Sequence, residues 1–385
     1  MKPAARKILR NFKSGVFAAV LGWGAAVAQI QPETVAAGLE NPWGVAFLPG
    51  GRFLVTERPG RLRLIGADGK IGASVAGLPA IAAGGQGGLL DVLADSGFEK
   101  NRTLYFCFSE PAAGGSSGNS TALARAQLSE DGAKLENLKI IFSQQPKVAS
   151  RSHFGCRIVE SRDGALFLTL GDRFSRKEDA QKLDNHLGKI VRIAKDGTAP
   201  RDNPFVGKAG ALPEIWSYGH RNGQGATLAP DDRFWMTEHG PQGGDEINVP
   251  QAGRNYGWPV ISYGQNYGTL TQVGEGTSKA GMEQPATWWD KIDGSVWMAG
   301  TQKSSIAPSG IAFYTATNIP EWQGNLFVGA LAGTALWRLT LSGDTVTGRE
   351  RLLADRGERV RDVRQGPDGW LYVLTDNGKL LRLQR

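Results

Sequence analysis

The sequence predicts an all-β protein, specifically a six-bladed β-propeller of four-stranded antiparallel blades. The 385 residues include 53 glycines and 11 tryptophans, which suits many short strands and tight turns. No long stretch rich in Leu, Glu, Lys and Ala has helical spacing. A degenerate hairpin repeat also recurs along the chain. These features favour an all-β fold over a helical or a doubly wound one.

Each copy of the repeat contains two short apolar strands separated by a turn of Pro, Asp and Gly. The turn residues supply the backbone angles of a hairpin, and the apolar alternation supplies a sheet face. The six copies, in chain order, occupy residues 43–57, 87–108, 155–172, 222–238, 309–329 and 361–375.

Further apolar segments extend these hairpins into four-stranded blades. Examples are residues 62–65, 190–193, 336–341 and 380–383. A circular array of blades buries both faces of every sheet and leaves only short edges. The alternative is a β-sandwich of unrelated hairpins, but the recurrence of one pattern favours the propeller.

The N-terminal segment has the features of a secretory signal. Five basic residues precede an apolar run over residues 16–28 that ends in Ala26-Val27-Ala28. The run is shorter than the roughly 20 residues of a membrane span. We therefore expect a signal peptide over residues 1–28, cleaved before Gln29, and one propeller domain over residues 29–385. An uncleaved anchor is the alternative.

The formal net charge of +7 belongs mostly to this segment, because removing its five basic residues leaves +2. The basic charge is therefore no argument for a nucleic-acid partner. No later segment is long and apolar enough to span a membrane. The expected protein is periplasmic, with no nucleic-acid partner and no stable membrane insertion, and it is a monomer or a homodimer.

The chain has two cysteines, Cys107 and Cys156, each in or beside an expected strand. The favoured interpretation is two buried small apolar side chains. A periplasmic setting also permits a disulfide, and the spacing does not decide between them.

Polar residues concentrate in the loops at one end of corresponding strands, where a propeller would gather them around its axis. These loops cover residues 84–88, 152–155, 171–172, 218–222, 238–248 and 355–362. A long insertion, residues 257–308, carries Trp258, Trp288, Trp289 and Trp297. Aromatic side chains suit the apolar faces of sugar rings, and packing over the blades is an equal alternative.

Several of these loops carry motifs that, taken together, are specific. They are GGQGGLLDV (84–92), HFGCRIV (153–159), IWSYGHRNGQG (215–225), EHGPQGGDEIN (238–248), NYGWP (255–259), APSGIAFY (307–314) and RGERVRDV (356–363). The sequence resembles the soluble aldose sugar dehydrogenases, relatives of soluble glucose dehydrogenase, over essentially the whole mature chain. The resemblance implies oxidation of the C1 hydroxyl of an aldose to an aldonolactone. Pyrroloquinoline quinone (PQQ) and calcium would be the cofactors, and an external acceptor would take the electrons.

The resemblance also implies the catalytic residues. His153 matches the general base that removes the C1 hydroxyl proton while hydride moves to C5 of PQQ, a task that suits a neutral imidazole. Asp172 matches the carboxylate that orients this histidine. Arg221 and Asn222 match a pair that contacts the quinone, where a guanidinium would stabilise developing negative charge.

The same comparison implies the cofactor ligands. Gln86 matches a quinone contact, and Arg359 and Arg361 match a pair that binds the PQQ carboxylates, for which arginine's planar fork is well suited. Gly240 and Pro241 match positions whose backbone carbonyls hold the calcium that also chelates PQQ.

A second, structural calcium site is implied by Glu246 and Tyr256, with Asp245 assisting. His220 and His239 flank these motifs and are interpreted as structural, because a zinc site needs more ligands than they supply.

One position departs from the family pattern. Ala332 stands where the family has a PQQ-contacting lysine, so cofactor binding is expected to be weaker unless another group, such as Lys303, compensates. Two other functions stay open on the sequence: a calcium-dependent lactonase-like propeller hydrolase, and a non-enzymatic propeller that binds carbohydrate or protein.

Overall fold

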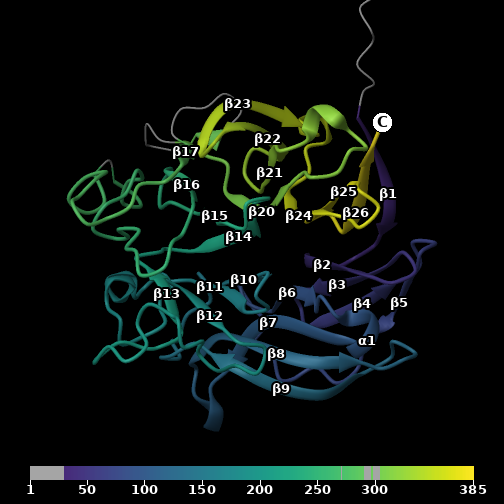
Figure 1. The fold of residues 1–385 in the computed structure, drawn as a ribbon, viewed down its shortest axis with the longest axis horizontal. Helices are drawn as coiled ribbons and strands as arrows, with labels where there is room; N and C mark the ends of the chain where they lie inside the picture. The colour runs from purple at the N-terminus through teal and green to yellow at the C-terminus, as the bar shows by residue number, and fades with distance from the viewer. Residues whose placement is uncertain (1–29, 270, 290–295, 298–303) are drawn as a thin grey trace, which may run out of the picture.

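The computed structural model describes residues 30–269, 271–289, 296–297 and 304–385. The expected signal peptide, residues 1–28, and Lys303 lie outside these residues. The described chain forms six four-stranded antiparallel sheets set around a common centre (Figure 1). The prediction of a six-bladed propeller is confirmed.

The first five blades each contain four strands that follow one another along the chain. Blade one comprises β2 (Pro42–Leu48), β3 (Arg52–Glu57), β4 (Arg61–Ile65) and β5 (Ile71–Ser74). Blade two comprises β6 (Leu89–Ala94), β7 (Thr103–Pro111), β8 (Asn119–Leu128) and β9 (Leu135–Ser143). Blade three comprises β10 (Gly155–Glu160), β11 (Leu166–Leu170), β12 (Lys189–Ile193) and β13 (Ile215–Tyr218). Blade four comprises β14 (Gly223–Leu228), β15 (Phe234–Glu238), β16 (Asp245–Asn248) and β17 (Thr287–Trp289). Blade five comprises β20 (Pro308–Phe313), β21 (Leu326–Ala330), β22 (Ala335–Ser342) and β23 (Thr345–Leu352).

The sixth blade joins the two ends of the described chain. It contains β24 (Val360–Gln365), β25 (Leu371–Thr375) and β26 (Lys379–Gln384), and its outermost strand is β1 (Gln31–Ala37). Strand β1 pairs antiparallel with β26, with Gln31 opposite Gln384. Strand β1 is not predictable from the sequence pattern, because this mostly exposed strand has no hairpin turn of its own.

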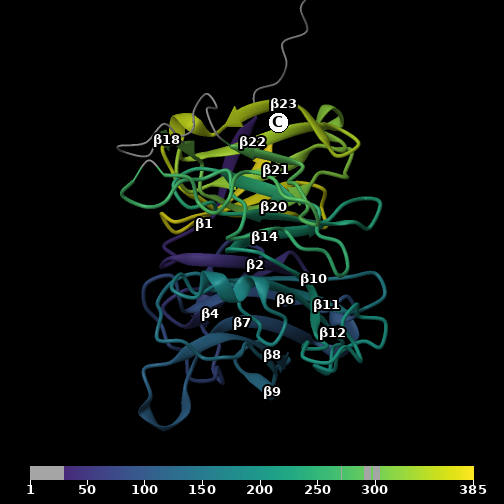
Figure 2. The ribbon, with the colours of Figure 1, turned by 90° about the vertical axis from the view of Figure 1, so that its left-hand side faces the viewer.

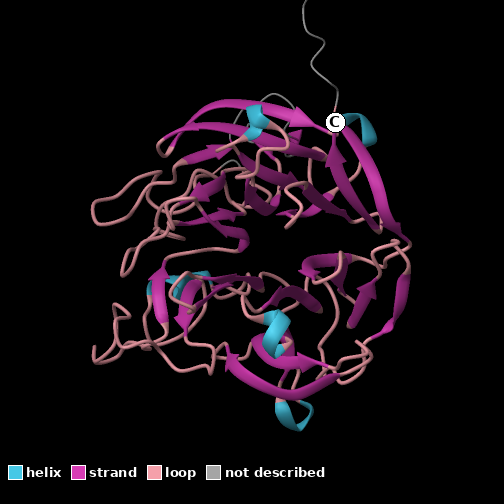
Figure 3. Cartoon of the chain, turned by 45° about the vertical axis from the view of Figure 1, so that its right-hand side comes forward, coloured by secondary structure: helices cyan, strands magenta, loops and turns pink. Residues whose placement is uncertain are grey.

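Short elements complete the described fold, which Figure 3 shows to be mostly strand and loop. They are β18 (Val296–Trp297), β19 (Ser304–Ser305), α1 (Phe98–Asn101) and the 3₁₀ turns at Ala113–Gly115, Lys177–Gln181, Pro320–Trp322 and Ala354–Arg356. Within the described ranges no helix has the length and apolar character needed to cross a membrane.

The innermost strands form a closed ring. Strand β2 packs on β6, and contacts continue through β10, β14, β20 and β24, which packs back on β2. Figure 2, a view turned by 90° from that of Figure 1, shows β2 lying between blades two and three on one side and blades four and five on the other. Apolar clusters join neighbouring blades, for example Leu54 with Phe106 and Trp235 with Trp337. The core therefore lies between blades and fixes where their strand ends meet.

A buried ion network joins three of these inner strands. Arg157 Nη1 lies 3.0 Å from Asp91 Oδ1 and 2.9 Å from Asp362 Oδ1. Arg364 Nη2 lies 2.7 Å from the same Asp91 oxygen. The Arg157 guanidinium also stacks 4.4 Å above the ring of Trp43. Removing one member of this network would leave a buried charge without its partner and is therefore expected to be strongly destabilising.

Cys107 in β7 and Cys156 in β10 form a disulfide, with their Cα atoms 5.8 Å apart. Both residues are fully buried, as expected, but the favoured interpretation of two separate thiols is wrong. The spacing of 49 residues could not reveal the bond, because only the packing of blade two on blade three brings the two strands together.

Replacing both cysteines by alanine is expected to lower the free energy of unfolding by about 2–4 kcal/mol, since the bond restricts the unfolded chain. Urea unfolding with and without reductant measures this. The double variant, which has no disulfide, is the control and should not respond to reductant. Reduction of the bond in the wild type should be verified by thiol titration. If the unfolding midpoint then stays unchanged, the disulfide does not stabilise the fold.

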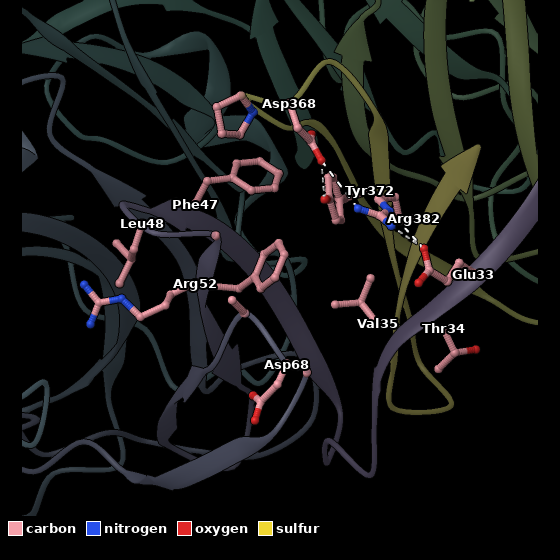
Figure 4. Close-up of a pocket in the computed structure, with 15 residues that line it drawn as sticks. Glu33, Thr34, Val35, Phe47, Leu48, Arg52, Asp68, Asp368, Tyr372 and Arg382 are labelled. Carbon is pink, nitrogen blue, oxygen red and sulfur yellow. Dashed lines mark hydrogen bonds and ion pairs between the residues drawn. The ribbon is translucent and has the colours of Figure 1, made fainter. Parts of the chain in front are cut away.

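A groove of about 350 Å³ lies between the first and sixth blades, at the end of the propeller that holds the β2–β3 turn (Figure 4). Arg382 Nη2 donates to Glu33 Oε2 at 2.6 Å, and the Tyr372 hydroxyl donates to Asp368 Oδ2 at 2.7 Å. The other two charged residues bond to backbone groups: Arg52 Nε donates to the Pro49 carbonyl at 3.1 Å, and Asp68 Oδ1 accepts from the N–H of Lys70 at 3.1 Å. Each charged side chain that lines the groove therefore has at least one hydrogen bond within the described residues, and none has evident reactivity.

Candidate active site

The residues implied by the sequence motifs gather at the opposite end of the propeller, where the inner strands begin. Gln86 precedes β6, His153 precedes β10, Asn222 precedes β14 and Arg359 precedes β24. Asp172 follows β11, and because β10 and β11 pair antiparallel, with Gly155 opposite Leu170, it reaches the same end. The closed ring of inner strands thus brings together loops that are far apart in the sequence.

These residues line three adjoining hollows. The axial hollow, of about 190 Å³, is lined by Arg58, Gln86, Asn222, His239, Arg359 and Arg361 among others. The histidine pocket, also about 190 Å³, is lined by His153, Asp172, Phe174, Arg221, Trp258 and Tyr267 among others. The acidic hollow is smaller and is lined by Glu238, His239, Gly240, Pro241, Glu246 and Tyr256 among others. His239 lines both the axial and the acidic hollows, and Arg221 lines both the histidine pocket and the acidic hollow.

His153 and Asp172 form a buried pair, with His153 Nδ1 2.6 Å from Asp172 Oδ1. The backbone of His153 is left-handed, with φ of 52°, and its N–H donates to Gln86 Oε1 at 2.7 Å. The carboxylate therefore holds the proton on Nδ1 and leaves Nε2 able to accept one. Burial, together with the charge of Arg221, lowers the pKa of His153, which keeps the imidazole neutral at neutral pH.

Asp172 is itself held by two further donors. The backbone N–H of Phe174 donates to Oδ1 at 2.7 Å, and the indole Nε1–H of Trp258 donates to Oδ2 at 2.8 Å. Burial alone would raise the pKa of Asp172, but the hydrogen bond and charge of His153 hold that pKa below its usual value. The carboxylate is thus ionised and fixed in orientation.

Exposed aromatic side chains form the outer part of the histidine pocket. Phe174 is 53% exposed and Tyr267 is 51% exposed, with ring centroids 5.9 Å apart. Phe174 also meets the His153 ring edge to face at 5.3 Å. Aromatic rings in such a place suit the apolar faces of a sugar. Neither residue was predicted as part of the site, because exposure cannot be read from the sequence.

Arg221 and Asn222 are neighbours in sequence but face different hollows. Arg221 donates from Nη1 to the His239 carbonyl at 3.0 Å and from Nη2 to the Tyr267 hydroxyl at 2.8 Å. Asn222 lines the axial hollow, and its Oδ1 accepts from the N–H of Gly155 at 3.1 Å. A bound group in contact with both would therefore bridge the axial hollow and the histidine pocket.

Arg359 and Arg361 share one carboxylate at the wall of the axial hollow. Arg359 Nε lies 2.8 Å from Asp376 Oδ2, and Arg361 Nε lies 2.8 Å from Asp376 Oδ1. None of the described residues that line this hollow is an aspartate or a glutamate. The hollow is therefore electropositive and suits an anion.

The segment around Ala332 adds no cation to this wall. The N–H of Ala332 donates to the Ile306 carbonyl at 2.9 Å, in the turn after β21. Its neighbour Leu331 lines the hollow, and the Leu331 carbonyl accepts from Arg359 Nη1 at 3.2 Å.

The acidic hollow contains oxygen groups with unmet bonding capacity. Burial and the charge of Glu238 raise the pKa of Glu246 to about 8. Asn248 Nδ2 donates to Glu246 Oε2 at 3.2 Å, while the buried Oδ1 of Asn248 has no hydrogen-bond partner among the residues that the structure describes. An orphaned oxygen beside two crowded carboxylates is an arrangement that a bound cation would relieve.

Both carboxylate oxygens of Asp245 accept hydrogen bonds from the surrounding backbone. Its Oδ1 accepts from the N–H of Gly240 at 3.0 Å, and its Oδ2 accepts from the N–H groups of Ile306 and Ala307, each at 2.9 Å. Asp245 thus positions the loop that carries Gly240, and its assistance in metal binding stays a prediction.

The two flanking histidines, interpreted from the sequence as structural, differ in their surroundings. His220 Nδ1 lies 3.1 Å from Glu238 Oε2, and its ring stacks on Tyr256 at 4.9 Å. His239 differs, because it lines both the axial and the acidic hollows. Its Nε2 donates to the Pro308 carbonyl at 2.6 Å, and burial lowers its pKa to about 4.

The tryptophans of the long insertion divide between packing and the site. Trp289 is fully buried in the core, and Trp288 stacks on Tyr263 at 4.1 Å. Trp258 alone of the three described side chains lines the histidine pocket.

Comparisons with known proteins agree with this fold. A family model described as glucose/sorbosone dehydrogenase matches residues 39–382. The aldose sugar dehydrogenase YliI of Escherichia coli (strain K12) is 43% identical over 364 residues, which cover 93% of this chain and 94% of that protein.

Solved structures show the same similarity. The soluble aldose sugar dehydrogenase from Escherichia coli in its apo form superposes with a TM-score of 0.86 at 42% identity, covering 92% of this chain and 99% of that one. The PQQ-bound aldose sugar dehydrogenase from Streptomyces coelicolor superposes with a TM-score of 0.74 at 27% identity, covering 92% and 98%.

The chain belongs to the glucose/sorbosone dehydrogenase family. It is accordingly an oxidoreductase of the sugar dehydrogenase class. This membership disfavours the lactonase-like hydrolase and the non-enzymatic binding propeller.

Proposed function

We propose that the protein is a PQQ- and calcium-dependent dehydrogenase that oxidises the C1 hydroxyl of an aldose to an aldonolactone and passes the electrons to an external acceptor. The observation that carries the proposal is the buried His153–Asp172 pair, set in an aromatic pocket beside an arginine-lined hollow. A base, a sugar-binding surface and an anion-binding wall are the three elements that such a reaction needs.

The described residues fit the cofactor in chemistry. PQQ carries several carboxylates, which match an axial hollow lined by arginines and by no described carboxylate. The side-chain amides of Gln86 and Asn222 face the same space and can contact polar ring atoms. When bound, PQQ supplies the acceptor for the hydride that leaves C1 of the sugar.

The acidic hollow fits calcium through oxygen donors. The carbonyls of Gly240 and Pro241 would hold an ion that also contacts PQQ, and Glu246 with Tyr256 would hold a second, structural ion. No cluster of three or more His, Cys, Asp or Glu side chains suited to a metal occurs in the described part of the chain, so calcium here would also use backbone, amide or water oxygens. The unpartnered Asn248 Oδ1 supports a cation near Glu246.

Each catalytic residue then has a defined role. His153 Nε2 accepts the proton of the C1 hydroxyl, and the C–O bond gains double-bond character as hydride departs from C1. Asp172 keeps the imidazole in the accepting tautomer and stabilises the imidazolium that forms. Arg221 is held by the His239 carbonyl and the Tyr267 hydroxyl. It stabilises negative charge that develops between the axial hollow and the histidine pocket.

We expect the acid limb of the kcat/KM profile to lie below pH 6.5, the ordinary pKa of histidine. Burial and Arg221 lower the pKa of His153, so the base stays neutral, and therefore active, to a lower pH; activity is lost as the pH falls through this lowered value. A dye-linked assay across pH, with an aldose in limiting concentration, measures the limb. A limb at pH 7 or above would show that another group is titrating or that His153 is not buried as described.

Trp258→Phe is expected to lower kcat by roughly tenfold, because Asp172 loses a hydrogen bond to its charged form. The aromatic volume is kept, so packing changes little. Trp288 lies outside the histidine pocket, so Trp288→Phe is the matched control and should retain full turnover. Equal turnover of the Trp258 variant and the wild type would show that Trp258 does not help to position the base.

We further propose export to the periplasm by the signal peptide over residues 1–28. The disulfide supports this proposal, since such bonds persist in oxidising compartments. Fractionation of cells that express the full chain should recover the protein outside the cytoplasm with Gln29 at its N-terminus. Recovery of uncleaved protein in the cytoplasm or the membrane would contradict the proposal.

The deciding experiment for the function is reconstitution. Purified apoprotein is incubated with PQQ and calcium, and several aldoses are assayed by reduction of a redox dye, with PQQ or calcium omitted as controls. We expect dye reduction only in the complete mixture. If the complete mixture reduces no dye with any aldose, and sugar does not change the visible spectrum of the PQQ-loaded protein, the proposed function is wrong.

A further inference from the structure

The axial hollow contains a third arginine, Arg58, which the motifs do not single out. Arg58 follows β3, and its backbone N–H donates to the Asn41 carbonyl at 3.0 Å. Its carbonyl accepts from the N–H of Leu89 at 3.1 Å, at the start of β6. These bonds fix the turn at the junction of blades one and two, and the half-buried side chain lines the hollow together with Arg359 and Arg361.

In the part of the chain that the structure describes, the charge of Arg58 has no direct partner. Arg359 and Arg361 each form an ion pair with Asp376, so one carboxylate serves two guanidinium groups. Within the described ranges, the Arg58 guanidinium makes neither a hydrogen bond nor an ion pair with any side chain. Burial and the nearby charges of Arg361 and Arg359 lower the pKa of Arg58, and Asp376 offsets this only in part. Three guanidinium groups therefore face one carboxylate, and the hollow has an uncompensated positive charge.

The remaining polar groups of this wall do not supply that missing anion. Gln86, Asn222 and Gln224 are neutral amides, and Ala332 stands in the segment that borders the hollow without contributing charge. A guanidinium that is half removed from water and free of other bonds can bind a planar carboxylate through two parallel N–H donors. Because the site is partly buried, salt screens this attraction less than it would on an open surface.

We infer that Arg58 binds a carboxylate of the PQQ cofactor and is the third cationic anchor of the axial hollow. The inference rests on the proposed function, since it assumes that PQQ occupies this hollow. It assigns Arg58 to cofactor binding rather than to the chemistry, because Arg58 lines the axial hollow and not the histidine pocket. In this way the chain can retain the cofactor although it has alanine at residue 332.

The test measures binding directly, without turnover. PQQ is titrated into calcium-loaded apoprotein, and binding is followed by quenching of tryptophan fluorescence, for the wild type, Arg58→Gln, Arg58→Lys and Arg102→Gln. The last variant removes an arginine that pairs with Glu130 and lies outside the axial hollow. The titrations are repeated with the trimethyl ester of PQQ, in which the carboxylates are neutral. Thermal unfolding of each apoprotein verifies that the variants are folded.

We expect Arg58→Gln to weaken PQQ binding by roughly ten- to a hundredfold. Arg58→Lys should lose less than the glutamine variant, and Arg102→Gln should match the wild type. The ester should bind the wild type and Arg58→Gln equally, because the interaction with a charged carboxylate is absent in both.

Two results would overturn the inference. One is a folded Arg58→Gln variant that binds PQQ within twofold of the wild type, and the other is an equal loss of affinity for PQQ and for its ester. Either result leaves the proposed function standing, provided that the wild type binds PQQ. If the wild type and Arg102→Gln both fail to bind PQQ in the presence of calcium, the proposed function itself fails.

Discussion

Replacing His153 by glutamine is expected to lower kcat for aldose oxidation by about 10²- to 10⁴-fold. The imidazole Nε2 is the only group of the buried pair that can accept a proton, because Asp172 is occupied by His153, Phe174 and Trp258. A glutamine amide fills similar space but is not a base at neutral pH. The rate is measured by dye reduction at saturating aldose, with protein reconstituted with PQQ and calcium.

PQQ affinity should change little in this variant, because His153 lines the histidine pocket and not the axial hollow. His186→Gln is a matched control. His186 is also buried, and its Nδ1 accepts from the N–H of Gln145 at 3.1 Å, but it lines none of the three hollows. A His153→Gln variant that binds PQQ and retains full turnover would refute the assignment of the base.

The second large effect is expected for Asp172→Asn, with kcat reduced by about 10²- to 10⁴-fold. An asparagine amide can donate to Nδ1, which would place the imidazole proton on Nε2 and block acceptance from the sugar. The charge of Asp172 also raises the pKa of His153 against the effects of burial and Arg221. Any residual activity should therefore show its acid limb at a lower pH than the wild type.

Asp172→Glu is the matched control for this variant, since it keeps the carboxylate while changing its reach. Its turnover should lie between those of the wild type and Asp172→Asn. If the glutamate and asparagine variants lose the same activity, geometry rather than charge determines the role of Asp172. An asparagine variant with wild-type kcat and an unshifted pH profile would exclude the pair from catalysis.

Much of the fold could be predicted from the sequence because each blade repeats one local pattern. The hairpin at residues 43–57 contains its own turn and its own alternation, and it forms β2 and β3. Strand β1 lacks such a signal, because its pairing with β26 is decided by closure of the ring. The disulfide depends in the same way on contact between blades two and three.

The site shows the same division between local and spatial information. Motifs located His153, Asp172 and the loops that line all three hollows, since these residues lie in recognisable strand-end segments. Arg58 lies in an ordinary turn after β3, and its importance arises from the position of its side chain beside Arg359 and Arg361. The bond from Trp258 to Asp172 spans 86 residues and could be found only from the folded structure.

The central claim is that His153 removes the proton of an aldose C1 hydroxyl while hydride leaves C1 for bound PQQ. The most direct test follows the spectrum of the PQQ- and calcium-loaded protein, without oxygen or dye, after mixing with an aldose that carries hydrogen or deuterium at C1. We predict reduction of the bound cofactor in a single turnover, slower with deuterium, and nearly abolished in His153→Gln with its cofactor still bound. Absence of reduction in the wild type, or reduction at an equal rate in His153→Gln, would contradict the claim.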